Sequence, residues 1–457
     1  MERTILHSDI NACYASIEEL YHPQLRGYPL AVAGDPEARC GIILAKNQLA
    51  KLAGVKTGMT IGEARALCPD LYVLPARMEL YLYVSSCANE IYARYTDRHE
   101  SFGLDEQWLD VTDCLGRFGH YTAGAEIADE IRRTFVRELG ITVSVGVSWN
   151  KIFAKLGSDY KKPDAVTVIT PENYREIVYP LPADQLLMVG GRTKKKLDLF
   201  GIHTIGQLAE ADDRLMELQF GKVGGMLKAY ARGEDDSPVI PSEAADPIKS
   251  IGNSCTTVRD MTTDEEVRRM IYAVAETVAA RLREGGFRCQ LVELWLRDRD
   301  LMCFTRQWTL GARRPASGGK AGRAADGQPV DHAAVERRQQ TGTKSRMAEW
   351  HLESITSTNS TAEIAEIAYQ LYLDHYVLDG SAYSRKPLRG IGIRTARLVE
   401  ERTAEQMTFF SDPDGREKRE KIDDCVDTLR RRFGCGSVQR GCLHRFELAE
   451  AIERRRT

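Results

Sequence analysis

Several common signals are missing from this chain of 457 residues. No run of about 18 apolar residues occurs, so no membrane-spanning helix is predicted. The N-terminus runs from Arg3 to Asp9 without the apolar core of a secretory signal peptide. The 11 cysteines never show CxxC spacing, which argues for reduced thiols and against disulfides or a zinc site. These absences predict a cytoplasmic protein.

An excess of charge of either sign is also missing. The 63 basic and 66 acidic residues leave a net charge of -3, which taken as a total gives no indication of a nucleic-acid partner. The total hides segregation, because acids gather at 234–236. Bases gather in two other places, at Lys194, Lys195 and Lys196, and at Arg385, Lys386, Arg389, Arg394 and Arg397. The neutral sum is therefore a cancellation of local charges.

The first 170 residues contain a mixed pattern of strands and helices. Alternation from Ser101 to Val111 predicts a β-hairpin with Asp105 and Glu106 near its turn. Strands are expected at 4–9, 29–33, 41–45, 142–147 and 165–169, and helices at 80–95 and 123–139. On the helix at 80–95, the residues predicted to share one face are Tyr83, Cys87, Ile91 and Tyr95. Hairpins and crossovers together predict an α+β domain with one sheet.

The remainder of the chain divides by composition. Residues 182–233 predict short helices, the acidic and proline-rich stretch that follows predicts a linker, and a small α/β domain begins near Lys249. Residues 311–350 have no sustained apolar period and are expected to be disordered. The helix expected at 416–432 is charged on nearly every face, which is typical of a solvated helix.

Three carboxylates stand where a metal site could form: Asp9 at a strand end, and Asp105 with Glu106 at the hairpin turn. Mg²⁺ prefers a few carboxylate oxygens together with phosphate oxygens. Two such ions about 4 Å apart stabilise the attacking and leaving oxygens of phosphoryl transfer. An acidic pair at a turn is more often simply solvated, so the pair alone leaves both interpretations open.

The surrounding residues resemble a known family. Three segments, 7–18 (HSDINACYASIE), 102–111 (FGLDEQWLDV) and 144–163, are similar in order and spacing to the motifs of Y-family translesion DNA polymerases. The bacterial DinB, or polymerase IV, branch is the most similar, and the likeness covers residues 3–310 and resumes from 356. It also implies a bacterial, nucleoid-associated protein.

The resemblance implies a right-hand polymerase with a C-terminal little finger. The palm would comprise 1–10 and 75–170, the fingers 11–74, and a helix-hairpin-helix thumb 171–233. A linker at 234–247, a little finger at 248–399 and a C-terminal tail at 400–457 would follow. These boundaries are expectations from the family pattern.

The same resemblance implies the site residues. Asp9, Asp105 and Glu106 would hold two Mg²⁺ ions, with the Ile10 carbonyl completing one shell. Tyr14 matches the aromatic steric gate against a ribose 2′-OH, although an aromatic on a core-facing helix would be the ordinary alternative. The other positions that would contact the nucleotide are Lys162, matching the triphosphate lysine, and Asn11, Cys13, Leu44, Gln48 and Lys51.

Four of these positions depart from the family pattern. Gln48 and Lys51 stand where tyrosine and arginine usually contact the triphosphate, and lysine lacks the bidentate fork of arginine. We expect weaker nucleotide binding, or help from Lys46. Leu44 replaces a small residue and would narrow the range of lesions, whereas Asn11 replaces an acid that is not a required ligand.

Two further regions imply partners. A glycine-rich hairpin before a helix makes a phosphate site, and the DNA contacts expected from the resemblance are Gly190, Gly191, Arg192, Lys194, Arg389 and Arg394. Met188 replaces the usual first glycine, so a distorted hairpin is expected. The peptide 406–410 (QMTFF) resembles a sliding-clamp motif, with Gln406, Phe409 and Phe410 as anchors. Packing of both phenylalanines on the last domain is the alternative.

The predicted function is therefore Mg²⁺-dependent, template-directed DNA synthesis past damaged bases, without proofreading. The expected partners are primer-template DNA, deoxynucleoside triphosphates and a clamp, with the chain itself a monomer. The modest net charge favours clamp recruitment over strong DNA binding by the chain alone. A catalytically silent DNA-binding scaffold of the same fold and, with less support, a palm-fold nucleotidyl cyclase stay open as alternatives.

Overall fold

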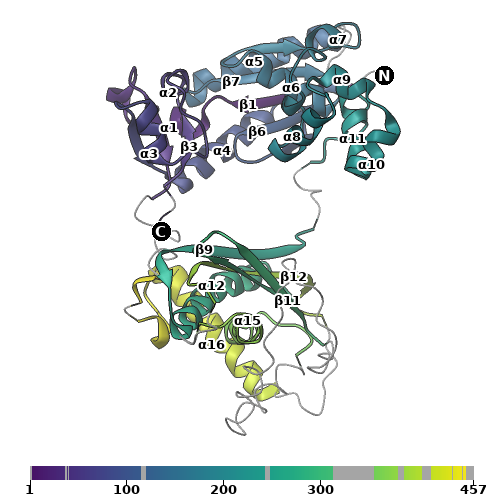
Figure 1. Ribbon diagram of the computed structural model, residues 1–457. Helices are drawn as coiled ribbons and strands as arrows, with labels where there is room; N and C mark the ends of the chain where they lie inside the picture. The colour runs from purple at the N-terminus through teal and green to yellow at the C-terminus, as the bar shows by residue number, and fades with distance from the viewer. Residues whose placement is uncertain are drawn as a thin grey trace. The chain divides into compact units, whose positions relative to one another are not determined.

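The computed structural model describes residues 3–35, 39, 41–114, 120–241, 247–311, 355–378, 385–403, 413–434, 436–444 and 446–448. The chain divides into two compact units, residues 1–36 with 41–246, and residues 37–40 with 247–457 (Figure 1). The clamp-like peptide 406–410 and all but the first residue of the predicted insertion lie outside the described residues. No helix in the described part is long and apolar enough to cross a membrane.

In its described residues, the first unit carries eight strands, and helices cover them (Figure 1). Its strands are β1 Ile5–Ile10, β2 Leu30–Ala33, β3 Ile43–Lys46, β4 Tyr72–Pro75, β5 His99–Ser101, β6 Glu106–Asp110, β7 Val143–Ser148 and β8 Val166–Val168. Its helices are α1 Cys13–Tyr21, α2 Gln48–Leu52, α3 Ile61–Leu67, α4 Met78–Tyr92, α5 His120–Leu139, α6 Lys151–Tyr160, α7 Tyr174–Ile177, α8 Gly191–Leu199, α9 Ile205–Glu210, α10 Asp213–Phe220 and α11 Lys222–Ala231.

The main sheet of the first unit has the strand order β5-β6-β1-β7-β8, so β1 lies in the centre. Every residue of β1 is buried, and β6 and β7 flank it antiparallel. Helix α6 approaches β7 closely, since a Cβ atom on Gly146 would lie 1.9 Å from the Ala154 carbonyl oxygen. This close packing places α6 directly beside the central strands. A smaller sheet has the order β3-β2-β4.

The predicted hairpin is confirmed, and the helix expected at 80–95 forms as α4 but ends at Tyr92, so Tyr95 lies outside it. Strands β5 and β6 pair antiparallel, with Glu106 beginning β6. On α4, Tyr83 is 67% exposed, whereas Tyr81 is fully buried. Either tyrosine could lie on an apolar face of the helix. The sequence does not show that the Tyr81 hydroxyl has a buried polar partner.

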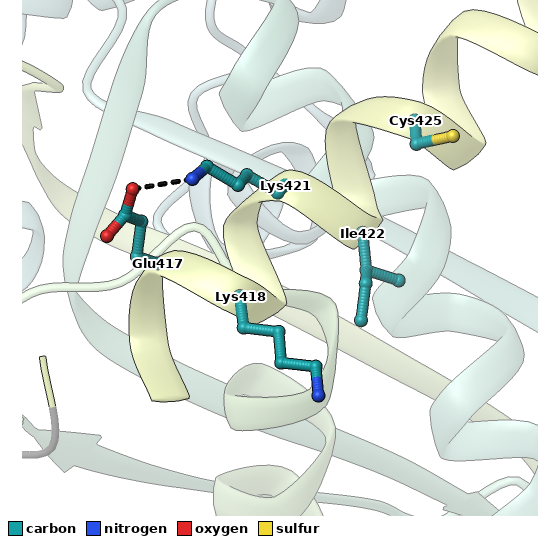
Figure 2. Close-up of a pocket in the computed structure, with 5 residues that line it drawn as sticks. All are labelled: Glu417, Lys418, Lys421, Ile422 and Cys425. Atoms are coloured by element: carbon teal, nitrogen blue, oxygen red, sulfur yellow. Dashed lines mark ion pairs between the residues drawn. The ribbon is translucent and has the colours of Figure 1, made fainter. Parts of the chain in front are cut away.

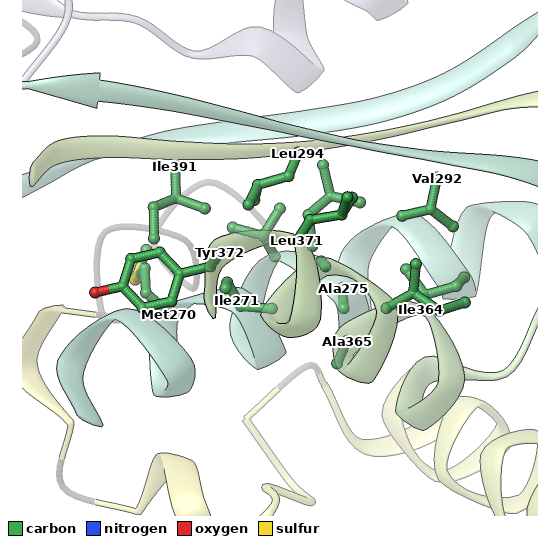
Figure 3. Packing of buried hydrophobic residues seen from close by; sticks show 14 of the residues in the cluster. Met270, Ile271, Ala275, Val292, Leu294, Ile364, Ala365, Leu371, Tyr372 and Ile391 are labelled. Atoms are coloured by element: carbon green, nitrogen blue, oxygen red, sulfur yellow. The ribbon is translucent and has the colours of Figure 1, made fainter. Parts of the chain in front are cut away.

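The second unit is a four-stranded sheet covered by helices on one face. Its elements are β9 Ser250–Met261, α12 Asp264–Glu284, β10 Phe287–Asp298, β11 Cys303–Thr309, α15 Thr361–His375, β12 Leu388–Glu400 and α16 Pro413–Phe433. The sheet order is β11-β10-β12-β9. Figure 3 shows Leu294 and Ile391 of the sheet packed over Ile271 of α12 and Leu371 of α15. The α+β class expected from the sequence is confirmed.

Helix α16 is anchored to this unit, although its sequence is typical of a solvated helix. Asp423 is buried, and its carboxylate accepts hydrogen bonds from the Thr361 amide and from Arg440, both at 2.9 Å. The following segment adds Leu443 and Phe446 to the core. Figure 2 shows five residues of α16 that line a pocket on the helix, Glu417, Lys418, Lys421, Ile422 and Cys425.

Candidate active site

The three predicted carboxylates lie together at one end of the central strands. The β1–β6 register places Asp9 directly opposite Glu106. Asp105 lies in the hairpin turn, where its carbonyl oxygen accepts a hydrogen bond from the Ile10 amide at 2.9 Å. Because Asp105 precedes the strand and Glu106 begins it, the turn brings two sequence neighbours to one site.

Two lysines form ion pairs with carboxylates of this group. Lys162 Nζ lies 2.5 Å from Asp9 Oδ2 and 2.8 Å from Asp159 Oδ1. Lys155 of α6 forms an ion pair with Glu106. Among the residues that the structure describes, no three His, Cys, Asp or Glu side chains are gathered tightly enough to hold a metal ion as they stand. Asp9 and Glu106 are therefore each paired with an ammonium group in this structure.

Burial and pairing shift the pKa values of these acids in different directions. Burial raises the pKa of Asp9 to about 6 despite the opposing charge of Lys162. Burial and the neighbouring Glu106 charge also raise the pKa of Asp105. For Glu106, burial is outweighed by hydrogen bonds with His7 and Lys155, which lower its pKa to about 2. Glu106 therefore keeps its negative charge most firmly.

His7 and Lys155 are site residues that the sequence reasoning did not single out. His7 is fully buried, with Nδ1 2.8 Å from Ser158 Oγ and Nε2 3.1 Å from Glu106 Oε2. Burial lowers the pKa of His7 to about 4, so its ring is neutral near pH 7. The alternation of β1 was a usable signal, since His7 and Asp9 are two residues apart and share one face.

The residues that follow β1 differ in burial and in hydrogen bonding. Tyr14, the second residue of α1, is partly buried and stacks on Tyr81. Cys13 is buried, which raises the pKa of its thiol to about 12. The Asn11 amide group is already used, because it donates to Thr142 Oγ1 and accepts from Ser144. Asn11 thus ties β1 to β7.

The predicted nucleotide contacts of the fingers lie on β3 and α2. Leu44 on β3 is partly buried, whereas Gln48 and Lys51 on α2 are exposed. Lys46 donates to Thr57 Oγ1 at 3.2 Å, and burial together with the nearby Lys51 charge lowers its pKa. Lys46, which was expected to add charge in place of the missing arginine, therefore lies close to Lys51.

Comparison with known proteins identifies the family. The model of the impB/mucB/samB family matches residues 8–159, and the model of its C-terminal domain matches 248–325. The DNA polymerase IV of Acetivibrio thermocellus is 44% identical over 443 residues, covering 97% of this chain and 98% of that protein. The chain belongs to the Y-family DNA polymerases, in the DNA polymerase IV group. The family and enzyme class expected from the motifs are therefore confirmed.

Two further relatives agree with this assignment. DNA polymerase IV 1 of Bacillus subtilis is 31% identical over 446 residues, covering 97% of this chain and 94% of that protein. A solved Y-family DNA polymerase chimera is 20% identical, with a TM-score of 0.66 over 87% of this chain and 99% of that one. At this identity the chimera shows the shared polymerase fold.

Met188 stands at the predicted glycine position of the thumb hairpin. Met188 has φ 72°, the left-handed region that glycine favours. Gly190 caps α8, and a Cβ atom on Gly190 or Gly191 would meet nothing within 4 Å. The hairpin is therefore open at its glycines. Of the predicted basic contacts, Arg192 is exposed, whereas Lys194 is paired with Asp184 at 2.9 Å.

The predicted little finger presents one sheet face away from its helices. Gly390 and Gly392 of β12 leave room for the Trp295 ring, which lies 3.5 and 3.2 Å from the positions of the missing Cβ atoms. Arg394 shares this face with Gly392 because the two are two residues apart on one strand, and its side chain is exposed. Arg389 is only partly exposed. Of the two predicted arginines, Arg394 is the more accessible.

Proposed function

We propose that this DNA polymerase is a template-directed enzyme of the translesion type that adds deoxynucleotides to a primer 3′-OH without proofreading. The observation that carries the proposal is the placement of Asp9 opposite Glu106, with Asp105 in the adjoining turn. Phosphoryl transfer depends mainly on positioning and charge stabilisation, which such a cluster supplies.

The donor set fits Mg²⁺. It consists of carboxylate oxygens from Asp9, Asp105 and Glu106 with the backbone carbonyl of Ile10, and hard divalent cations prefer oxygen ligands. The ion pairs with Lys155 and Lys162 show that the cluster already attracts cations. When bound, a pair of Mg²⁺ ions would lower the pKa of the primer hydroxyl and stabilise the pyrophosphate leaving group.

The chain's own residues then have distinct roles. Lys162, once released from Asp9, would supply a point charge to the triphosphate. Lys46 and Lys51 would add charge from the fingers in place of an arginine fork. The ring of Tyr14 would occupy the space that a ribose 2′-OH requires.

DNA would be held through its phosphates rather than through its bases. The open glycines of the thumb hairpin, Gly190 and Gly191, and the exposed Arg192 fit a backbone contact. Arg394 supplies an exposed charge on the sheet face of the second unit. Contacts of this type are independent of sequence and weaken with salt, which suits an enzyme that must copy any template.

A primer-extension assay with Mg²⁺ tests the proposed activity. Asp105→Asn should lower extension by at least about 10³-fold, while DNA affinity stays within about threefold of the unmodified chain. Asp97→Asn, on the loop before β5, is the matched control and should extend normally. Failure of the unmodified chain to extend, with DNA binding intact, would establish the catalytically silent scaffold instead.

We also propose that residues 406–410 bind a sliding clamp and that the chain acts as a monomer. Replacing Gln406, Phe409 and Phe410 by alanine should leave extension without a clamp unchanged and abolish stimulation by it. Equal stimulation before and after the replacement would reject clamp binding through this peptide.

A further inference from the structure

A second buried carboxylate lies behind the proposed gate and outside the metal cluster. Glu18 on α1 is 1% exposed. Burying a charge is costly unless it is paired and hydrogen-bonded. Arg77 meets this need by donating from Nε to Oε1 at 3.0 Å and from Nη2 to Oε2 at 2.5 Å. The buried Glu18 carboxylate is therefore fixed in position by Arg77.

A third hydrogen bond to Glu18 connects it to the gate. The Tyr81 hydroxyl donates to Glu18 Oε1 at 2.6 Å. The Tyr81 ring stacks on Tyr14, with 4.3 Å between ring centroids and an interplanar angle of 10°. Tyr81 is fully buried, whereas Tyr14 is partly exposed. The hydroxyl of the buried ring is thus fixed, and its flat face supports the ring beside it.

These contacts join helices α1 and α4. Tyr14 and Glu18 are four residues apart on α1, and Arg77, the N-cap residue of α4, is four before Tyr81, so each pair lies on one side of its helix. The ring contact and the carboxylate contacts join the same two faces. The ring of Tyr14 is therefore restrained from behind by a side chain that is itself hydrogen-bonded at its far end.

We propose that Glu18 and Tyr81 are positioning residues that set how strictly Tyr14 excludes ribonucleotides. This inference rests on the proposed function, because it takes Tyr14 as the gate. A gate ring that can tilt admits a 2′-OH, and a ring backed by an anchored aromatic cannot tilt away. The hydrogen bond to Glu18 thus acts on sugar selection through the position of a ring, without touching the nucleotide.

The test compares kcat/KM for a deoxynucleoside triphosphate with that for its ribonucleoside counterpart. Tyr14→Ala measures the full contribution of the gate. Tyr81→Phe keeps the ring and removes its hydroxyl, and should lower the selectivity ratio by about three- to tenfold. Glu18→Gln should lower it similarly. Tyr92→Phe on the same helix removes a buried hydroxyl that donates to Ser8 Oγ, and should leave the ratio unchanged.

A double-mutant cycle separates positioning from general support of the fold. In a Tyr14→Ala background, Tyr81→Phe should no longer change the ratio, because the two residues act through one ring. If Tyr14→Ala alters the ratio but Tyr81→Phe and Glu18→Gln do not, the inference is overturned while the gate stands. If Tyr14→Ala leaves the ratio unchanged, the gate assignment itself fails and the inference fails with it.

Discussion

Two clusters of paired charge, one in each unit, use different cations. In the candidate active-site cluster, Lys162 pairs with Asp9 and Lys155 with Glu106. In the cluster beneath α16, every cation is an arginine. Its members are Arg283, Arg430, Arg440, Glu276, Asp423 and Asp427. Both clusters satisfy carboxylates that would otherwise be costly to bury.

The choice of cation indicates what each cluster does. A guanidinium group offers several donors in a rigid plane, so one arginine can join carboxylates from different elements. Arg440 contacts both Glu276 of α12 and Asp423 of α16, at 3.0 and 2.9 Å. A lysine is a point charge on a flexible stem and can leave. The arginine cluster is therefore suited to holding helices together, and the lysine cluster to exchanging cations.

Removing an anion from the arginine cluster should give the largest loss of stability. Asp423→Ala leaves Arg283, whose side chain is 8% exposed, with one carboxylate fewer. We expect the free energy of opening of α12 to fall by about 3 kcal/mol, measured by amide hydrogen exchange resolved by peptide. The neighbouring Asp424→Ala, at an exposed position, is the control. Equal effects of the two variants would show that α16 is held by its apolar contacts alone.

Removing a cation from the lysine cluster should have a smaller effect that depends on metal. Lys155→Met leaves Glu106 with His7 alone as its partner, which should lower the opening free energy of β1 by about 1 kcal/mol in EDTA. Saturating Mg²⁺ should restore it, because a metal ion no longer competes with the ammonium group. Lys161→Met, at an exposed position, supplies the control. Identical stabilisation by Mg²⁺ with and without Lys155 would contradict exchange of cations.

The sequence predicted the lysine cluster better than the arginine cluster. Asp9, Asp105 and Glu106 stand at the ends of short, strongly patterned segments, and pairing of adjacent strands brings them together. Lys155 was not predicted because it lies in the middle of α6, where its position in the sequence does not show which strand residue it contacts. Its contact with Glu106 depends on how closely α6 packs on β7, which Gly146 permits.

The arginine cluster could not be predicted from local pattern. Asp423 lies in a helix charged on all sides, and its partner Arg283 is 140 residues away. No period distinguishes a buried acid from the exposed ones beside it. The same reason applies to α4, where the buried Tyr81 donates its hydroxyl hydrogen to Glu18, 63 residues earlier in the chain. Partners distant in the sequence decide which polar residues are buried.

The smallest effect is expected for an ion pair that shares α16 with Asp423 but faces water. Glu417 and Lys421 pair at 2.7 Å one turn apart, and their side chains are 64% and 74% exposed (Figure 2). Solvent screens such a pair, and holding two long side chains together costs entropy. Lys421→Met should therefore leave hydrogen exchange of α12 unchanged, although the substitution removes a charge partner just as Asp423→Ala does. A loss of α12 opening free energy close to that of Asp423→Ala would mean that burial does not decide how much an ion pair contributes to stability here. The difference between the two clusters would then depend on the type of cation alone.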